Sequence, residues 1–115
     1  MKTYLKPIYE NVKSYYNKAV VETDFDGENM HYNLYSYGTL VLSIKRVEYA
    51  DDSISYTYRF NQNVDVEKLF SNTTLRHIKE FINQCFYTGE TKITKQWLLD
   101  NQNKDFYYQS TKFQY

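Results

Sequence analysis

The fold is decided by residues 30–60, which read MHYNLYSYGTLVLSIKRVEYADDSISYTYRF. Apolar and polar side chains alternate over residues 30–35, 40–45 and 54–60 of this stretch. Alternation with a period of two is typical of antiparallel strands that bury one face of a sheet. The dipeptide Tyr37-Gly38 separates the first two runs and predicts a chain reversal. The stretch therefore predicts three consecutive antiparallel strands.

One further strand is expected just upstream. Residues 19–24 are rich in β-branched side chains, and Asp26-Gly27 is a strong signal for a hairpin turn. The four strands then follow one another as a meander between residues 19 and 61. We expect the buried face of the last two strands to carry Leu40, Leu42, Ile44, Tyr56, Tyr58 and Phe60.

Helical spacing flanks the strand region on both sides. Pro7 suits the first position of a helix, and apolar side chains follow it at helical spacing, which predicts a helix over residues 7–16. Downstream, Thr73 or Thr74 can cap a strongly amphipathic helix, in which Arg76, Lys79, Glu80 and Asn83 form the polar face. Its apolar stripe consists of Leu75, Ile78, Phe81, Ile82 and Cys85.

The C-terminal region completes the predicted architecture. We expect a short helix over residues 93–100, anchored by Trp97, and an edge strand within residues 106–115. Residues 1–115 then form a single α+β domain. Its architecture is a four-stranded antiparallel meander, with an N-terminal helix and one or two C-terminal helices packed on one face.

Composition narrows the class of protein. The chain has 115 residues, and its 14 basic and 14 acidic side chains give a formal net charge of zero. A protein that binds nucleic acid through bulk charge usually carries a basic surplus. The single cysteine, Cys85, suits a reducing compartment, and no apolar run approaches the roughly 20 residues of a membrane span. A cytoplasmic protein that does not cross a membrane is expected.

Catalytic and metal-binding motifs are not recognisable in the sequence. His31, His77 and Cys85 are the soft metal ligands, and His77 lies roughly 12 Å from Cys85 along one helix, too far to share an ion. We interpret Cys85 as a core residue and His77 as a capping or surface residue. Three glycines are too few for a phosphate-binding loop or a nucleophile elbow. We therefore expect no enzyme activity, no metal site and no cofactor.

Charge is unevenly distributed along the chain. Residues 1–18 carry a net charge of +3, residues 19–52 a net charge of −5 and residues 53–115 a net charge of +2. The first and third turns of a meander lie at the same end of the sheet. Six carboxylates are therefore expected to gather at one edge of the domain: Asp24, Asp26, Glu28, Glu48, Asp51 and Asp52.

Two interpretations of this acidic edge stay open. Turns favour Asp for its local hydrogen bonds and need solvation, so the cluster can be structural. Alternatively, a fixed group of carboxylates imitates phosphates and docks into a basic nucleic-acid channel of another protein. In that case Tyr35 and Tyr37, placed on the same strand face as His31, supply aromatic anchors beside the charges.

Three stretches together resemble a known family and keep their order along the chain: KSYYNKA at residues 13–19, LYSYGTLV at residues 34–41 and TTLRHIKEF at residues 73–81. The similar proteins are short proteins of unknown function carried on phages and plasmids of low-GC Gram-positive bacteria. The family brings no established catalytic residues to carry over. What the resemblance implies is a mobile-element setting, in which small accessory proteins often inhibit host defence, anti-CRISPR proteins included.

Two hypotheses of function follow. The first is a non-enzymatic counter-defence protein, an anti-CRISPR-type inhibitor that binds a host nucleic-acid-handling effector, with a Cas9-type effector as the favoured target. The second is a small phage or plasmid regulatory protein that binds DNA or RNA directly. It would use Tyr35 and Tyr37 to stack on bases, together with the Arg76/Lys79 face or the basic N-terminal residues Lys2, Lys6, Lys13 and Lys18.

Overall fold

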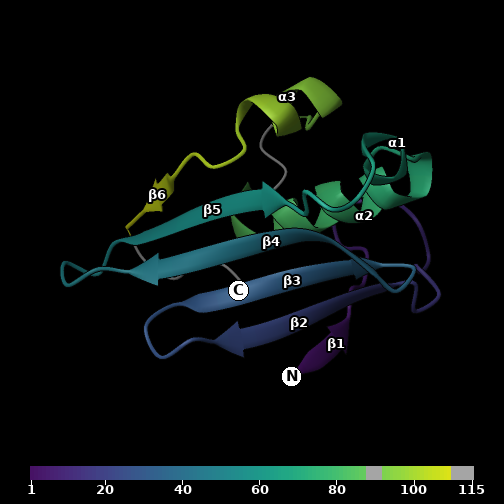
Figure 1. Ribbon diagram of the computed structural model, residues 1–115. Coiled ribbons are helices and arrows are strands. Elements are labelled where there is room, and N and C mark those ends of the chain that lie inside the picture. Colours follow the sequence, from purple (N-terminus) through teal and green to yellow (C-terminus); the bar gives the residue numbers. More distant parts are fainter. Residues whose placement is uncertain (88–91, 110–115) are drawn as a thin grey trace.

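A six-stranded antiparallel sheet, in which the strands lie in chain order, forms the framework of the protein (Figure 1). The computed structural model describes residues 1–87 and 92–109. The strands are β1 (Lys2–Tyr4), β2 (Ala19–Phe25), β3 (Met30–Ser36), β4 (Thr39–Glu48), β5 (Ile54–Phe60) and β6 (Phe106–Tyr108).

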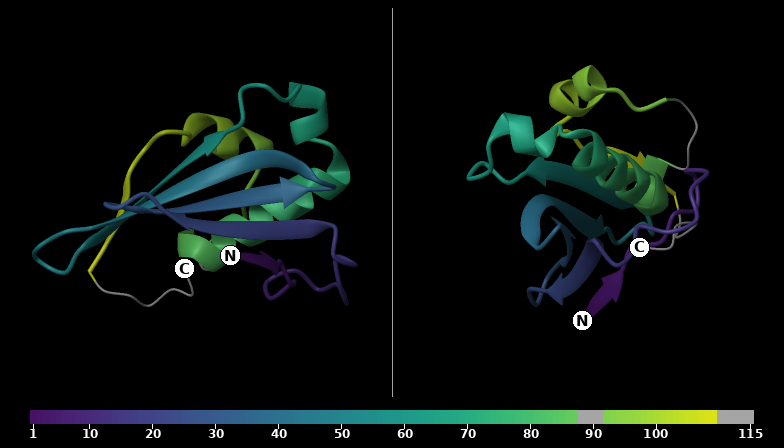
Figure 2. Two further views of the ribbon diagram at one scale, coloured as in Figure 1. Left: turned by 60° about the horizontal axis from the view of Figure 1, so that its bottom comes forward. Right: turned by 90° about the vertical axis from the view of Figure 1, so that its right-hand side faces the viewer.

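Short helices cover one face of this sheet (Figure 2). They are α1 (Val66–Leu69), α2 (Asn72–Ile82), which continues as a π-helical turn over Asn83–Tyr87, and α3 (Lys95–Asp100). α3 corresponds to the helix expected over residues 93–100. Its Trp97 stacks on Tyr58 of β5 with ring centroids 6.0 Å apart, which holds α3 beside the sheet.

The core lies between α2 and the covered face of the sheet. The predicted apolar stripe of α2, from Leu75 to Cys85, is buried, and it shares one core cluster with Tyr56 and Tyr58 of β5. On β4 the expected Leu40 is replaced by Val41, because the register of β3 and β4 shifts between Leu34 and Tyr35 and inserts one extra residue. The core strands were therefore predictable, but the bulge was not.

The predicted four-stranded α+β meander is wrong in the number of its strands. The four strands expected between residues 19 and 61 are present, but β1 and β6 extend the sheet on either side. Each edge strand has three residues, too few for a periodic pattern to reveal. The edge strand expected within residues 106–115 is present as β6, while residues 110–115 lie outside the described residues.

The predicted helix over residues 7–16 is also wrong, since this segment contains no helix. Three consecutive backbone N–H groups, those of Ile8, Tyr9 and Glu10, converge on the carboxylate of Glu80 on α2. Of the side chains at helical spacing, Ile8, Tyr9 and Tyr16 are exposed. The segment therefore follows the surface of α2 and does not close a helix of its own, because α2 supplies the acceptor.

The start of α2 also differs from the prediction. Ser71 precedes the first helical residue, so the helix begins earlier than a cap at Thr73 or Thr74 would place it. Thr74 is buried and lies 3.1 Å (Oγ1 to Oγ) from Ser36 of β3. Its hydroxyl therefore joins the helix to the sheet and does not cap it.

The two ends of the sheet carry different turns. The β2–β3 and β4–β5 turns lie at one end of the sheet (Figure 1). We call it the acidic end, because the six carboxylates predicted to gather lie in these turns or at the strand ends beside them. The β3–β4 turn and the start of β2 lie at the opposite end. The meander topology fixes this separation.

Candidate functional site

The segment before β2 and the β3–β4 turn meet at the end of the sheet opposite the acidic end. Ala19 pairs with Ser36, so Lys18 and Tyr37 lie side by side, and the backbone N–H of Tyr37 donates to the carbonyl of Lys18 at 2.8 Å. Together with the first turns of α2 they enclose a pocket of about 550 Å³. Its lining residues are Val12, Lys13, Ser14, Tyr15, Tyr16, Lys18, Tyr37, Thr73, Arg76 and His77.

His77 lines this pocket with a buried side chain. Its side chain is 1% exposed, and its Nδ1 lies 2.8 Å from the buried Ser36 Oγ. The ring of Tyr15 meets the imidazole edge-on at 4.7 Å, and the ring of Tyr37 lies 5.8 Å away. Burial lowers the pKa of His77 below 6.5, so the imidazole is neutral at pH 7.

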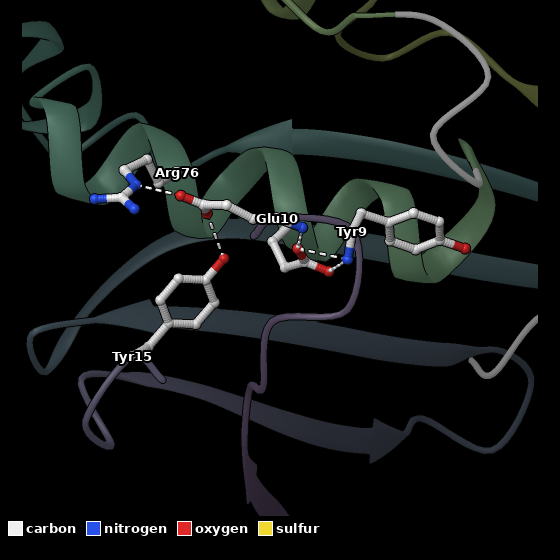
Figure 3. Close-up of polar contacts among 5 residues, drawn as sticks. Tyr9, Glu10, Tyr15 and Arg76 are labelled. Atoms are coloured by element: carbon white, nitrogen blue, oxygen red, sulfur yellow. Dashed lines mark hydrogen bonds and ion pairs between the residues drawn. The ribbon is translucent and has the colours of Figure 1, made fainter. Parts of the chain in front are cut away.

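A chain of polar contacts fixes Arg76 beside the pocket. The Tyr15 hydroxyl donates to Glu10 Oε2 at 2.6 Å, and the other oxygen of the Glu10 carboxylate accepts from Arg76 Nε (Figure 3). Burial, followed by this hydrogen bond, raises the pKa of Tyr15 well above 10.0. Within the described residues only Nε of Arg76 is engaged, so its terminal nitrogens are available to a ligand.

Glu80 anchors the segment that carries one wall of the pocket. Its side chain is buried and accepts from the backbone N–H groups of Ile8, Tyr9 and Glu10 at 2.8–3.2 Å. Gln84, one turn later, donates to the same carboxylate at 2.7 Å and to the carbonyl of Lys6 at 2.6 Å. Residues 6–10 are therefore tied to the helix before the chain reaches the pocket.

Two exposed tyrosines flank the opening of the pocket. Tyr16 and Tyr37 are 73% and 55% exposed, and each has a backbone φ of 52°. This left-handed conformation favours glycine and asparagine, and a bulky side chain there costs on the order of 1 kcal/mol. Aromatic side chains thus stand at two strained positions of one pocket, although neither contributes to the core.

The pocket combines positive charge with aromatic surface. Lys13, Lys18 and Arg76 carry positive charge at its lining, and the nearby Glu10 carboxylate is already bound by Tyr15 and Arg76. Cations that line one pocket favour anionic groups, and the tyrosine rings offer flat surfaces for a planar group. The arrangement therefore suits a ligand that carries both a phosphate and an aromatic ring.

A second, smaller hollow lies on the face of the sheet that the helices leave uncovered. It has a volume of about 320 Å³ and contains His31, Lys45 and Arg59, with hydroxyl and amide groups around them. The carboxylate of Asp26 lies 2.6 Å from His31 Nε2, and no aromatic side chain lines the hollow. It offers charge without a stacking surface.

The six carboxylates predicted to gather are exposed at the acidic end, three on each pair of strands. Three of them are engaged within the protein. Asp26 accepts from the backbone N–H groups of Asn29 and Glu28 and contacts His31, Glu48 contacts Arg46, and Asp51 accepts from Ser53. Asp24, Glu28 and Asp52 have no side-chain partner among the described residues.

The structure does not bring Tyr35 and Tyr37 to the acidic end. Tyr35 lies near the far end of β3, where its hydroxyl donates to Glu22 at 3.3 Å and Lys2 lies over its ring. Tyr37 belongs to the β3–β4 turn and lines the pocket. The proposed aromatic anchors are therefore separated from Asp24 and Asp51 by the length of the sheet.

Sequence reasoning missed the buried polar residues of the pocket. The interpretation of His77 as a capping or surface residue is wrong, because its ring is buried against Ser36 and Tyr15. Cys85 is a core residue as expected. The contact between Ser36 and His77 joins β3 to α2, which no local pattern reveals. Ser36 Oγ lies outside the pocket lining, so this pair does not offer a hydroxyl to a ligand.

Residues 1–87 and 92–109 contain neither a metal-ligand cluster nor a membrane-spanning helix. No group of three or more His, Cys, Asp or Glu side chains in these ranges could hold a metal ion. None of the helices in this part of the chain is long and apolar enough to cross a membrane.

One family model matches residues 3–100, and it describes a family of unknown function (DUF8033). No curated protein and no solved structure matches the chain. The match covers both walls of the pocket as well as the acidic end.

Proposed function

The chain belongs to this family of unknown function, DUF8033, and from its geometry we propose that it is a non-enzymatic protein that binds single-stranded nucleic acid. The observation that carries the proposal is the pocket at the β3–β4 turn, which is lined by Lys13, Lys18 and Arg76 together with exposed tyrosine rings. Cationic grooves combined with aromatic stacking surfaces are the usual means of holding single strands. The protein would act in the cytoplasm.

Local charge supports this function despite a net charge of zero. The segment over residues 1–18 supplies Lys13 and Lys18, and α2 supplies Arg76, whereas the unpaired carboxylates lie at the other end of the sheet. At physiological ionic strength a charge is screened over about 8 Å, so a strand at the pocket is little affected by the acidic end.

Fluorescence anisotropy with labelled 15-nucleotide strands tests the proposal. We expect sub-micromolar binding of single-stranded DNA or RNA in low salt and much weaker binding of duplex DNA. If three cations contact phosphates, the slope of log K against log salt concentration is about −2. Lys13→Glu/Lys18→Glu should lower affinity by at least tenfold.

The open face of the sheet supplies a matched control. Lys45→Glu/Arg59→Glu makes the same change in net charge outside the pocket and should leave affinity within about twofold. If this control loses binding and the pocket variant does not, the strand binds at the open face of the sheet and not at the pocket. Absence of binding by the parent protein in low salt would contradict the proposed function.

A second candidate function is inhibition of a host nucleic-acid-handling effector, such as a Cas9-type nuclease, by a counter-defence protein. Its support is the topology that gathers Asp24, Glu28 and Asp52 at one end with no side-chain partner among the described residues. A pull-down from host lysate, followed by a DNA-cleavage assay on the recovered effector, tests it. Reversing Asp24, Asp26, Asp51 and Asp52 to lysine should abolish inhibition, and full inhibition by that variant would contradict the mechanism.

A further inference from the structure

The pocket is large enough for a small molecule, and its lining includes both buried and exposed aromatic rings. Its volume of about 550 Å³ falls in the range of roughly 300–1,000 Å³ for small-molecule sites. Of its lining residues, His77 and Tyr15 are buried, whereas Tyr16 and Tyr37 are mostly exposed. A phosphate needs only the cations, so the ring-lined interior suits a different, planar part of the ligand.

His77 presents an unused hydrogen-bonding atom inside this interior. Its Nδ1 is taken by Ser36 Oγ, which lies outside the pocket lining, and Nε2 has no hydrogen bond to any described residue. The side chain is 1% exposed, and Nε2 is not among the buried side-chain atoms that lack a partner; of the described residues, only Arg46 Nε is such an atom. As part of the pocket lining, His77 can therefore offer Nε2 to a ligand without first breaking a hydrogen bond.

We propose that the pocket takes one unstacked nucleotide, whose base enters between the tyrosine rings and hydrogen-bonds His77 Nε2, while its flanking phosphates lie against Lys13, Lys18 and Arg76. The proposal rests on the proposed function and adds to it a defined position for one base. A base paired in a duplex cannot enter, because its edge is occupied and its faces are stacked.

The exposed rings at the pocket suit such an occupant. Tyr37 and Gly38 form the two-residue β3–β4 turn, in which hairpin geometry requires left-handed residues, but turn geometry does not require an aromatic ring at Tyr37. The rings of Tyr16 and Tyr37 are mostly exposed and so are available for stacking. A base between aromatic rings is a use that requires rings and tolerates any base identity. His77 then adds the polar contact that distinguishes one base edge from another.

Short strands of equal charge distinguish the contribution of the base to affinity from that of the phosphates. Four homopentanucleotides and a five-residue abasic strand carry the same phosphates, so any difference in affinity comes from the base. We expect at least one homopentanucleotide to bind tenfold or more tighter than the abasic strand. Equal affinity for all five would overturn the base pocket while leaving the proposed function in place. No binding by any strand would overturn both.

Free nucleotides give the second arm. The four nucleoside monophosphates should bind more weakly than the corresponding pentanucleotides, because they lack the phosphates on either side. A monophosphate that binds as tightly as the pentanucleotide would support the base pocket and overturn its use for strands.

His77→Asn tests the contact to the base edge. Asparagine keeps a polar atom near Ser36 but removes Nε2, so the order of affinity among the four homopentanucleotides should change while affinity for the abasic strand does not. An unchanged order would overturn the role of His77. The ¹⁵N shifts of the imidazole in the parent protein provide an independent measurement, since Nε2 should shift on adding the preferred pentanucleotide more than on adding the abasic strand.

Discussion

The carboxylate of Glu80 accepts the backbone N–H of Glu10 at 2.8 Å across 70 residues of sequence. The side chain of Glu10 in turn holds Tyr15 and Arg76 at the pocket. One buried acid on α2 therefore fixes the N-terminal segment, and that segment supplies Lys13 and Tyr16 to the pocket. Stability and the shape of the binding site are coupled through this carboxylate.

Replacing Glu80 should lower both stability and binding. Glu80→Ala leaves three backbone N–H groups and the Gln84 amide without their acceptor, at a cost of about 2–4 kcal/mol in the free energy of unfolding. Glu80→Gln keeps the shape but turns one acceptor into a donor that faces N–H groups, so it should also destabilise. Urea denaturation measures both variants, with Glu67→Ala on the exposed surface of α1 as the control.

This acid also explains which parts of the fold the sequence could predict. Alternation over residues 30–60 identified β3, β4 and β5, because each strand buries one face and carries its pattern locally. Residues 7–16 carry helical spacing as well, but their conformation depends on an acceptor seventy residues away. A local sequence pattern cannot predict a contact between residues so far apart in the chain.

The candidate site was predictable only in its components. The hypothesis of direct nucleic-acid binding names Lys13, Lys18, Arg76 and Tyr37, but it offers the lysines and Arg76 as alternative surfaces, whereas one pocket contains all four. The acidic end was located correctly, since it follows from strand order alone. The buried contact between Ser36 and His77 depends on how α2 crosses β3, and residue patterns do not specify that packing.

The β2–β3 turn should resist acid because of Asp26. Hydrogen bonds from the backbone N–H of Asn29, then the contact with His31, lower the pKa of Asp26 from 3.8 to about 2. The contribution of this carboxylate to stability is therefore present above pH 3.8 and is lost as the pH falls toward 2. A ¹³C-detected NMR titration should give the low pKa directly. In His31→Ala it should rise but stay below 3.8, and a value of 3.8 in the parent would contradict the turn geometry.

His77 should make the protein less stable in mild acid. Its folded-state pKa lies below 6.5, with burial as the main cause, Glu10 acting to raise it and Arg76 to lower it. Between that value and 6.5 the unfolded chain binds more protons, so stability is full above pH 6.5 and falls as the pH drops below it. Urea unfolding between pH 7.5 and 5 should show this loss. In His77→Asn the free energy of unfolding should depend less on pH over the same range. An equal pH dependence in the variant would show that another group causes the loss.

The apolar stripe of α2 should carry much of the stability. Phe81 is fully buried in the core cluster, and Phe81→Ala should cost roughly 3–5 kcal/mol, because it removes buried apolar surface and leaves a cavity. Leu99→Ala on α3, where the side chain is 47% exposed, should cost less than about 1 kcal/mol. Comparable losses in the two variants, measured by urea denaturation, would contradict the packing of α2 on the sheet.

We expect Tyr16 to lower the stability of the protein and to raise its affinity for single strands. Its φ of 52° suits asparagine better than tyrosine, and its ring is 73% exposed, so Tyr16→Asn should stabilise the protein by about 1 kcal/mol. The same change removes a ring beside the pocket and should weaken binding of single strands by about tenfold. Asn103→Gly alters another left-handed residue outside the pocket without changing charge, and it should leave binding unchanged. Urea denaturation and anisotropy on the same samples measure both quantities. A Tyr16→Asn variant that is more stable and binds as tightly as the parent would show that the strain at this position does not serve the strand.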